Sequence, residues 1–412
     1  MKKKILIFAL VLLVVVGAIA FSVYLPLIKQ QKAREAELER IANAKVIVEV
    51  KEPREASFMK EVHVSDFITN INGEIIDDFK IDTSRLGPQT VKFKYINEEN
   101  ITITYRYSVN VIDDVAPVIW VSGTKSIPVG TLYEDFMEKI TCADNLDDNP
   151  KCEVIGNYDL KKVGKYPLTY RATDKYGNQT EKKFTLNVYQ PQPSSGGSST
   201  PRASWQFKDI INDYKKANTK IGIDVSAWQG DIDFERVKEA GVEFAFIRVG
   251  SGKGIEADRF VDKKFQRNIE GFNRVGIPVG VYFYSYANSK KEAIKDAKFV
   301  LEQIKGYKVE LGVAYDWESW SFYNNFHQSF YSNTMNAKAF LDTVSKEGYK
   351  GLLYGSANYL KKAWYPLDEY DVWLAHYTKK TNYDGKYKVW QLASNGRVSG
   401  INGFVDVNIM YE

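Results

Sequence analysis

Two acidic residues in the last third of the chain have a spacing that suits acid–base chemistry. Asp316 and Glu318 follow the short apolar run 312–315, which is typical of a buried strand. In an extended chain, residues i and i+2 face the same side with Cα atoms roughly 6.5 Å apart, so we expect both carboxylates to enter one space. Two carboxylates about 5–10 Å apart can cleave a glycosidic bond, because one protonates the leaving oxygen while the other stabilises the developing positive charge. The pair alone is weak evidence, since many such pairs are solvated strand ends.

The elements around this pair predict a barrel. Apolar strand-like runs alternate with amphipathic helical runs, which indicates a parallel sheet with helices outside. The last three strands are too close in sequence for crossover helices, so that part is expected to contain strands alone. The eight expected strands are 221–225, 244–249, 278–284, 312–315, 351–354, 372–375, 388–392 and 405–409. Eight strands in this length suggest a closed barrel.

The carboxyl ends of barrel strands carry the chemistry in this class of fold. Asp224 ends the first strand, Asp316 and Glu318 end the fourth, and Asp406 lies in the eighth, beside the first if the barrel closes. Polar and aromatic residues, Arg248 among them, gather at the same end. The candidates for substrate binding are Trp228, Tyr284, Tyr354, Trp373, His376, Trp390 and Gln391. An inward tryptophan in a barrel is as often part of the core as a sugar platform.

These residues also resemble a known family. The segments 222–230, 244–248, 276–282, 315–318, 373–377 and 390–391 look like those of glycoside hydrolase family 25 lysozymes, in order and spacing. The resemblance implies a (β/α)5(β)3 barrel and an N-acetylmuramidase that cuts the β-1,4 bond between N-acetylmuramic acid and N-acetylglucosamine in peptidoglycan. The family's acids correspond to Asp224, Asp316, Glu318 and Asp406. Trp317, where smaller apolar residues are frequent, and the insert 320–331 depart from the pattern.

The acidic pair leads to a mechanistic hypothesis. Crowding by Asp316 and burial are expected to raise the pKa of Glu318 and make it the general acid. Asp316 is expected to stay ionised and to act either as nucleophile or by orienting the substrate's own N-acetyl group. Asp224 and Asp406 are expected to hold substrate and to tune the charge of the pair, although a purely structural role competes for Asp406.

The start of the chain predicts export. Three lysines precede an apolar run over 5–28, which is about 36 Å long as a helix and therefore long enough to span a bilayer. We expect residues 1–28 to form an uncleaved signal anchor, with the C-terminal domains outside the cell and the lysines inside. Secretion after cleavage near Ala20 is the alternative, because 18–20 has the small-x-small form. Residues 29–45 are expected to form a juxtamembrane helix.

Two β-sandwich modules are expected next, over 46–113 and 114–190, because short alternating segments are separated by turn residues. The second resembles bacterial immunoglobulin-like domains of surface proteins at 114–119, 164–166 and 172–178, which implies spacing or adhesion. Cys142 and Cys152 are expected to form a disulfide that closes an acidic loop, which we interpret as a solvated turn. The Pro- and Ser/Gly-rich linker 191–204 leads to the barrel domain 205–412.

The composition of the chain indicates which classes of partner and cofactor to expect. The net charge of +4 over 412 residues comes without a basic stripe, so no nucleic-acid partner is expected. The three histidines lack metal-ligand spacing and no cysteine cluster occurs, so we expect no cofactor and no metal. The expected partners are peptidoglycan strands and the membrane. A cell-wall-binding protein with a non-catalytic barrel is the alternative, and a glycosidase for another acetylated glycan is a third possibility.

Overall fold

The computed structural model describes residues 2–192, 204–318 and 327–412, and the side chains of residues 1–20 and of Val23 lie outside this description. The chain divides into two compact units, Met1–Asp114 and Val115–Glu412. Most of the predicted linker 191–204 and of the predicted insert 320–331 falls outside the described residues.

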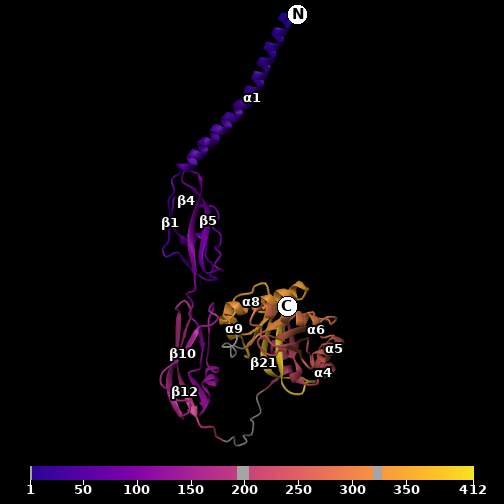
Figure 1. Cartoon of the computed structure of the whole chain (residues 1–412). Helices are drawn as coiled ribbons and strands as arrows, with labels where there is room; N and C mark the ends of the chain where they lie inside the picture. Colours follow the sequence, from indigo (N-terminus) through magenta and orange to yellow (C-terminus); the bar gives the residue numbers. More distant parts are fainter. Residues whose placement is uncertain (1, 193–203, 319–326) are drawn as a thin grey trace. The chain divides into compact units, whose positions relative to one another are not determined.

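The first unit begins with one long helix, α1 (Lys2–Ala42), which is continuous through both predicted N-terminal segments (Figure 1). Within the described part of the chain, no helix has an apolar stretch of the length needed to cross a membrane. The predicted anchor 1–28 falls mostly on residues whose side chains are not described. Of those that are described, Phe21, Tyr24 and Leu27 are exposed.

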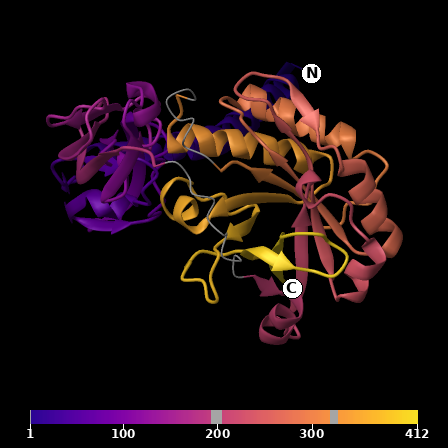
Figure 2. The same cartoon turned by 90° about the horizontal axis from the view of Figure 1, so that it is seen from below.

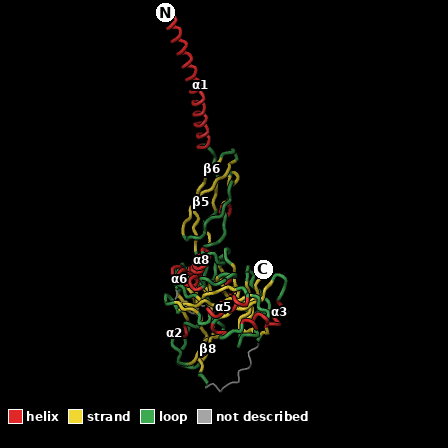
Figure 3. Tube along the Cα trace, turned by 90° about the vertical axis from the view of Figure 1, so that its right-hand side faces the viewer, coloured by secondary structure: helices red, strands yellow, loops and turns green. Residues whose placement is uncertain are grey.

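The first module is built mainly from strands and loops, as the yellow and green trace around β5 and β6 shows (Figure 3), and it contains one short 3-10 helix. Its sheets have the orders β2-β6-β5-β4 and β1-β3. Alternate residues of β5 are buried, which places Phe93 and Tyr95 in the core between the sheets. The elements are β1 (Val48–Val50), β2 (Glu55–Ser57), η1 (Val64–Phe67), β3 (Ile68–Ile71), β4 (Gly73–Ile75), β5 (Gly87–Asn97) and β6 (Thr102–Ile112).

The second module also has two sheets, in the orders β10-β11-β12-β8 and β7-β9. The predicted disulfide between Cys142 and Cys152 is confirmed. The loop that it closes is not the solvated turn that we expected, because Asp144 and Asp147 are buried and accept hydrogen bonds from backbone amides. The elements are β7 (Val118–Trp120), β8 (Thr124–Pro128), α2 (Tyr133–Met137), β9 (Thr141–Ala143), β10 (Lys151–Ile155), β11 (Gly164–Thr173) and β12 (Gln179–Tyr189).

The third domain is a closed barrel. Its sheet has the order β21-β20-β19-β18-β17-β15-β14-β22, and pairing of β21 with β22 closes it. All neighbours are parallel except that β22 runs antiparallel to both β14 and β21. The strands are β14 (Thr219–Val225), β15 (Phe244–Gly252), β17 (Val279–Tyr284), β18 (Val313–Asp316), β19 (Gly351–Ser356), β20 (Asp371–Ala375), β21 (Val389–Arg397) and β22 (Val405–Tyr411), with β13 (Trp205–Gln206) and β16 (Arg259–Val261) added at its margins.

Helices cover the outside of the barrel strands (Figure 2). Leaving aside the marginal strand β16, an α-helix lies between each pair of consecutive barrel strands from β14 to β20, and none lies in the described segments between β20, β21 and β22. This alternation confirms the predicted barrel with a strand-only end. The helices are α3 (Phe207–Tyr214), η2 (Ala227–Gln229), α4 (Phe234–Glu239), α5 (Phe265–Val275), α6 (Lys290–Gln303), α8 (Phe330–Lys346) and α9 (Ala357–Lys362).

Aromatic side chains fill the barrel interior below the cleft. The rings of Phe246 and Trp373 lie 4.4 Å apart between their centroids, and both side chains are buried. Gly222 makes room for this layer, because a Cβ atom there would come within 2.5 Å of the Phe244 ring. The packed layer forms a floor that keeps polar side chains at the mouth of the barrel.

Candidate active site

Four acidic side chains meet at the mouth of the barrel. Asp224, Asp316, Glu318 and Asp406 all line one pocket of about 250 Å³. Asp224 lies near the end of β14 and Asp316 ends β18, so both are held by extended backbone. Asp406 enters from antiparallel β22 and pairs directly with Asp224 in the strand register. The structure therefore brings together all four acids that the sequence predicts.

Asp224 is held by two side-chain amides. Its Oδ2 atom accepts hydrogen bonds from Gln391 Nε2 and Asn408 Nδ2, each at 2.8 Å. Asn408 in turn accepts a bond of 2.8 Å from the indole Nε1 of Trp373. Burial raises the pKa of Asp224 to about 6, although the two amide bonds favour its ionised form.

Asp316 and Glu318 form a hydrogen-bonded pair in different surroundings. Asp316 is 3% exposed, and burial followed by the Glu318 charge raises its pKa well above the usual range. Glu318 is more exposed than Asp316. Desolvation by the surrounding protein atoms raises the pKa of Glu318, although its hydrogen bonds with Asp316 and Tyr354 act in the opposite direction. The raised pKa of Glu318 was expected, but we had expected Asp316 to stay ionised. Asp316 is the more buried of the two, so ionisation costs it more.

Asp406 completes the acidic cluster. Its side chain is half-buried, and burial together with the charges of Asp224 and Glu318 raises its pKa to about 8. Like charges in a small pocket disfavour each other's ionisation, so the four acids bind protons at a pH where exposed carboxylates are ionised. Such a cluster can both donate a proton and stabilise a developing positive charge.

Most of the predicted substrate-binding residues lie around this cluster. Tyr284, Tyr354, Trp373 and Gln391 line the pocket, together with Trp228, whose side chain is 84% exposed at its rim. An adjoining pocket of about 430 Å³ shares Glu318 and Tyr354 with the first and includes His376. The cleft therefore extends to both sides of Glu318.

Trp390 is the exception. It lines neither pocket: its indole Nε1 donates to the carbonyl of His376 at 2.9 Å, and its ring packs edge-on against Tyr214. Neighbouring residues of a strand point to opposite faces, so Trp390 must face the outer core when Gln391 faces the cleft. The prediction that Trp390 contacts sugar is corrected accordingly.

Three polar residues of the site were missed by the sequence reasoning. Tyr282 and Tyr377 line the acidic pocket, and Asn408 holds Asp224. The i, i+2 rule that paired Asp316 with Glu318 would have found two of them, because Tyr282 precedes Tyr284 and Asn408 follows Asp406 at that spacing.

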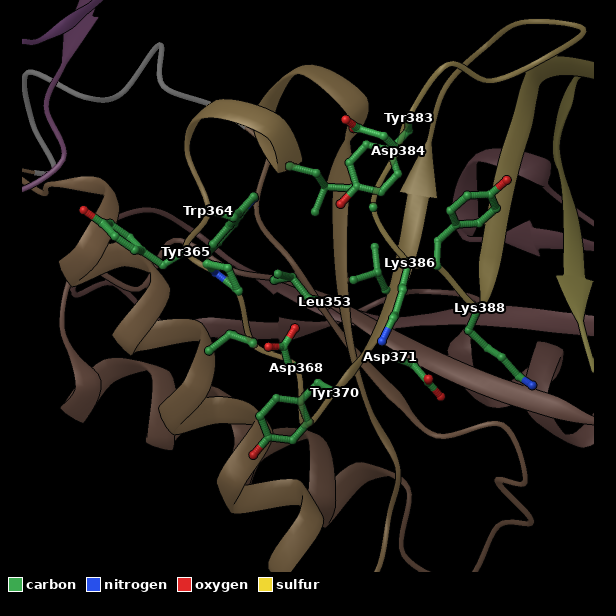
Figure 4. Close-up of a pocket in the computed structure, with 16 residues that line it drawn as sticks. Leu353, Trp364, Tyr365, Asp368, Tyr370, Asp371, Tyr383, Asp384, Lys386 and Lys388 are labelled. Atoms are coloured by element: carbon green, nitrogen blue, oxygen red, sulfur yellow. The ribbon is translucent and has the colours of Figure 1, made fainter. Parts of the chain in front are cut away.

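The described part of the barrel has further pockets outside the acidic cleft. A pocket of about 500 Å³ lies away from the cleft, where Trp364, Tyr370, Tyr383 and Lys386 converge (Figure 4). Its lining contains none of the four clustered acids. Among the described side chains, no set in the acidic cleft has the ligand-atom spacing of a metal site. The groups in the described lining of the acidic cleft that can exchange protons are carboxyl and phenol groups.

Comparisons with known proteins agree with this geometry. The family model described as glycosyl hydrolases family 25 matches residues 223–401, and the model described as bacterial surface protein, Ig-like domain, matches residues 122–188. An autolytic lysozyme from Clostridium acetobutylicum is 28% identical over 193 residues, which cover 46% of this chain and 56% of that protein. This chain thus spans little more than half the length of that relative.

Two further comparisons concern an uncharacterized relative and a solved structure. The uncharacterized protein YegX from Escherichia coli K12 is 31% identical over 205 residues, covering 46% of this chain and 68% of YegX. The modular autolysin LytC from Streptococcus pneumoniae is 27% identical, with a TM-score of 0.42 and coverage of 59% of this chain and 56% of LytC. From the matched model and the extent of the likeness to YegX, we conclude that the chain belongs to glycosyl hydrolase family 25.

Proposed function

We propose that this chain is a muramidase that hydrolyses the β-1,4 bond between N-acetylmuramic acid and N-acetylglucosamine in bacterial peptidoglycan. The observation that carries the proposal is the convergence of four carboxylates with raised pKa values in one pocket at the barrel mouth. A similarity to an autolytic lysozyme supports the choice of substrate. The cleft on both sides of Glu318 suits a polymer that is cut internally.

Glu318 acts as the general acid in this proposal. It lies nearest to solvent within the acidic pair, where the oxygen of a glycosidic bond can reach it. Its hydrogen bond to Asp316 provides a path for the proton that the pair retains. Asp316 acts, after it has lost its proton, either as the nucleophile or by orienting the substrate's acetamido group through its N–H. Asp224, whose two amide hydrogen bonds favour its ionised form, then carries negative charge close to the positive charge that develops on the sugar.

The variant Glu318→Gln tests the general acid. Because the amide cannot protonate the leaving oxygen, release of reducing ends from purified peptidoglycan is expected to fall by about 10²–10⁴-fold. Glu302→Gln, on the exposed face of α6, provides a matched control that should retain wild-type activity. Far-ultraviolet circular dichroism checks that both variants are folded. Wild-type rates in folded Glu318→Gln protein would remove Glu318 from this role.

A non-catalytic wall-binding protein is the second candidate function. The immunoglobulin-like module favours it, because such a module can hold the barrel at a distance from its attachment point. A suspension of cell walls discriminates between the two functions. A hydrolase clears the suspension with time, whereas a binding protein sediments with the walls and leaves the turbidity constant.

The attachment itself is also a proposal: residues 1–28 anchor the protein in the cell membrane with the modules and the barrel outside. Its support is the apolar run after three lysines and the exposed apolar side chains at Phe21, Tyr24 and Leu27. Fractionation tests it, since full-length protein should sediment with membranes and resist extraction by salt. Recovery of a shortened chain in the medium would favour cleavage near Ala20.

A further inference from the structure

Arg248, which lines the cleft, forms a buried ion pair with Asp262, a residue that the sequence analysis did not single out. Asp262 follows β16, and its side chain is fully buried. Its Oδ2 atom accepts a hydrogen bond from Arg248 Nε at 2.8 Å, and Arg248 Nη2 forms an ion pair with the same oxygen at 2.6 Å. Arg248 lines the acidic pocket and is the one cation among the described residues that do so. The only positive charge in the described lining is therefore bound to a carboxylate outside the pocket.

The same carboxylate also holds the turn that presents Trp228. Asp262 Oδ2 also accepts a hydrogen bond, 3.1 Å long, from the backbone N–H of Ala227, the first residue of η2. Its Oδ1 atom accepts from the backbone N–H of Lys264 at 2.9 Å, which ties it to the start of α5. Asp262 thus connects the middle of β15, the rim turn and a helix of the outer layer.

Without Asp262, no neighbouring carboxylate among the described residues outside the cleft would offset the positive charge that Arg248 exerts on the acidic cluster. A guanidinium at the edge of a group of carboxylates favours their ionised forms, and Arg248 does lower the pKa of Asp316. A negative charge on the far side of the guanidinium offsets much of that effect. The balance matters because the pair Asp316 and Glu318 must keep a proton to act as an acid.

We propose that Asp262 is a positioning residue that holds the Arg248 guanidinium against the cleft wall, and so limits the positive charge acting on the catalytic carboxylates while it fixes the Trp228 turn. The proposal rests on the proposed hydrolysis for its functional part. The ionisable groups of the described lining that share the cleft with Arg248 come from six strands or the loops that follow them: Asp224, Tyr282, Tyr284, Asp316, Glu318, Tyr354, Tyr377 and Asp406.

The variant Asp262→Asn tests the proposal through the pH profile of peptidoglycan hydrolysis. Leaving the guanidinium uncompensated should lower the pKa values of the cluster, so both limbs of the profile are expected to move to lower pH by about 0.5–1 unit. Asp262→Glu should restore part of the shift. In an Arg248→Gln background, Asp262→Asn should produce little further shift, because the charge that it uncovers is absent.

Asp296→Asn is the matched control. Asp296 forms an ion pair with Arg259 at 2.5 Å, and the exposed fractions of the two side chains are 4% and 17%. The corresponding values for Asp262 and Arg248 are 0% and 19%. Asp296, however, lines neither pocket of the cleft. Its loss should reduce stability without moving the pH profile. If Asp262→Asn loses activity and stability in the same way, with unchanged profile midpoints, Asp262 has only a structural role and the proposal is wrong.

A second measurement separates this test from the proposed function. If wild-type protein does not cleave peptidoglycan, the muramidase proposal fails, but the electrostatic effect remains measurable in unfolding experiments on the full-length protein. Wild-type stability should fall between pH 5 and pH 8 as the buried cluster ionises, and that fall should be smaller in Asp262→Asn. An equal fall in both proteins would overturn the inference regardless of activity.

Discussion

Replacing Asp224 by asparagine is expected to stabilise the barrel at alkaline pH while it removes a candidate catalytic acid. Asp224 is 6% exposed, and its pKa rises from 3.8 to about 6, mainly because of burial. A carboxyl whose pKa is higher in the folded than in the unfolded chain stabilises the fold fully below its unfolded pKa. That contribution is lost as the pH rises through the folded value, here between about pH 4 and pH 7.

The structure sets the magnitude of this effect. The pKa of Asp224 rises from 3.8 to about 6 on folding. Because a change of one in pKa corresponds to about 1.4 kcal/mol, ionisation of Asp224 lowers the free energy of unfolding by ~3 kcal/mol at pH 8. The asparagine oxygen can accept the same two hydrogen bonds from Gln391 and Asn408, but the amide cannot ionise. The free energy of unfolding of the variant, relative to wild type, should therefore increase by ~2–3 kcal/mol from pH 4 to pH 8.

Urea unfolding followed by tryptophan fluorescence measures this difference. Seven of the eight tryptophans lie between residues 205 and 390, so the signal reports mainly on the barrel. Asp209→Asn, an exposed position in the first turn of α3, is the control and should give a difference that is constant with pH. A constant difference for Asp224→Asn as well would refute the reasoning, because burial would then impose no cost on ionisation.

Three other perturbations test neighbouring parts of the molecule. Asn408→Ala leaves the Trp373 indole N–H without its acceptor and removes one of the two amide donors to the buried Asp224, so urea unfolding should show a loss of ~2–4 kcal/mol. A loss below ~1 kcal/mol would contradict the network. Trp228→Ala should raise KM about tenfold with unchanged stability, because its ring is exposed at the rim; an unchanged KM would exclude sugar stacking. The double variant Cys142→Ser, Cys152→Ser should lower the stability of the second module by ~2–3 kcal/mol, as measured by calorimetry, while peptidoglycan hydrolysis persists. An unaltered thermal transition would show that the disulfide does not stabilise this loop.

Short-range sequence patterns were sufficient to predict much of the candidate active site. Strand alternation placed Asp316 and Glu318 on one side, and the rule that parallel strands end at one edge brought Asp224 to the same mouth. The same alternation, applied to 390 and 391, would have directed Trp390 away from the cleft. Composition marked the loop after Cys142 as polar, but composition does not reveal that Asp144 and Asp147 are buried and bonded to backbone amides.

The amino-acid sequence by itself determined the family, the barrel with its strand-only end, the disulfide partners and the identity of the acids at the barrel mouth. These depend on local periodicity and on residue spacing, which are properties of the chain. The tertiary structure alone decided which acid of the pair holds a proton more strongly, which amides hold Asp224, and which carboxylate offsets the charge of Arg248. Those properties depend on burial and on contacts between residues far apart in the chain, such as Asp224 with Asn408, and packing determines both.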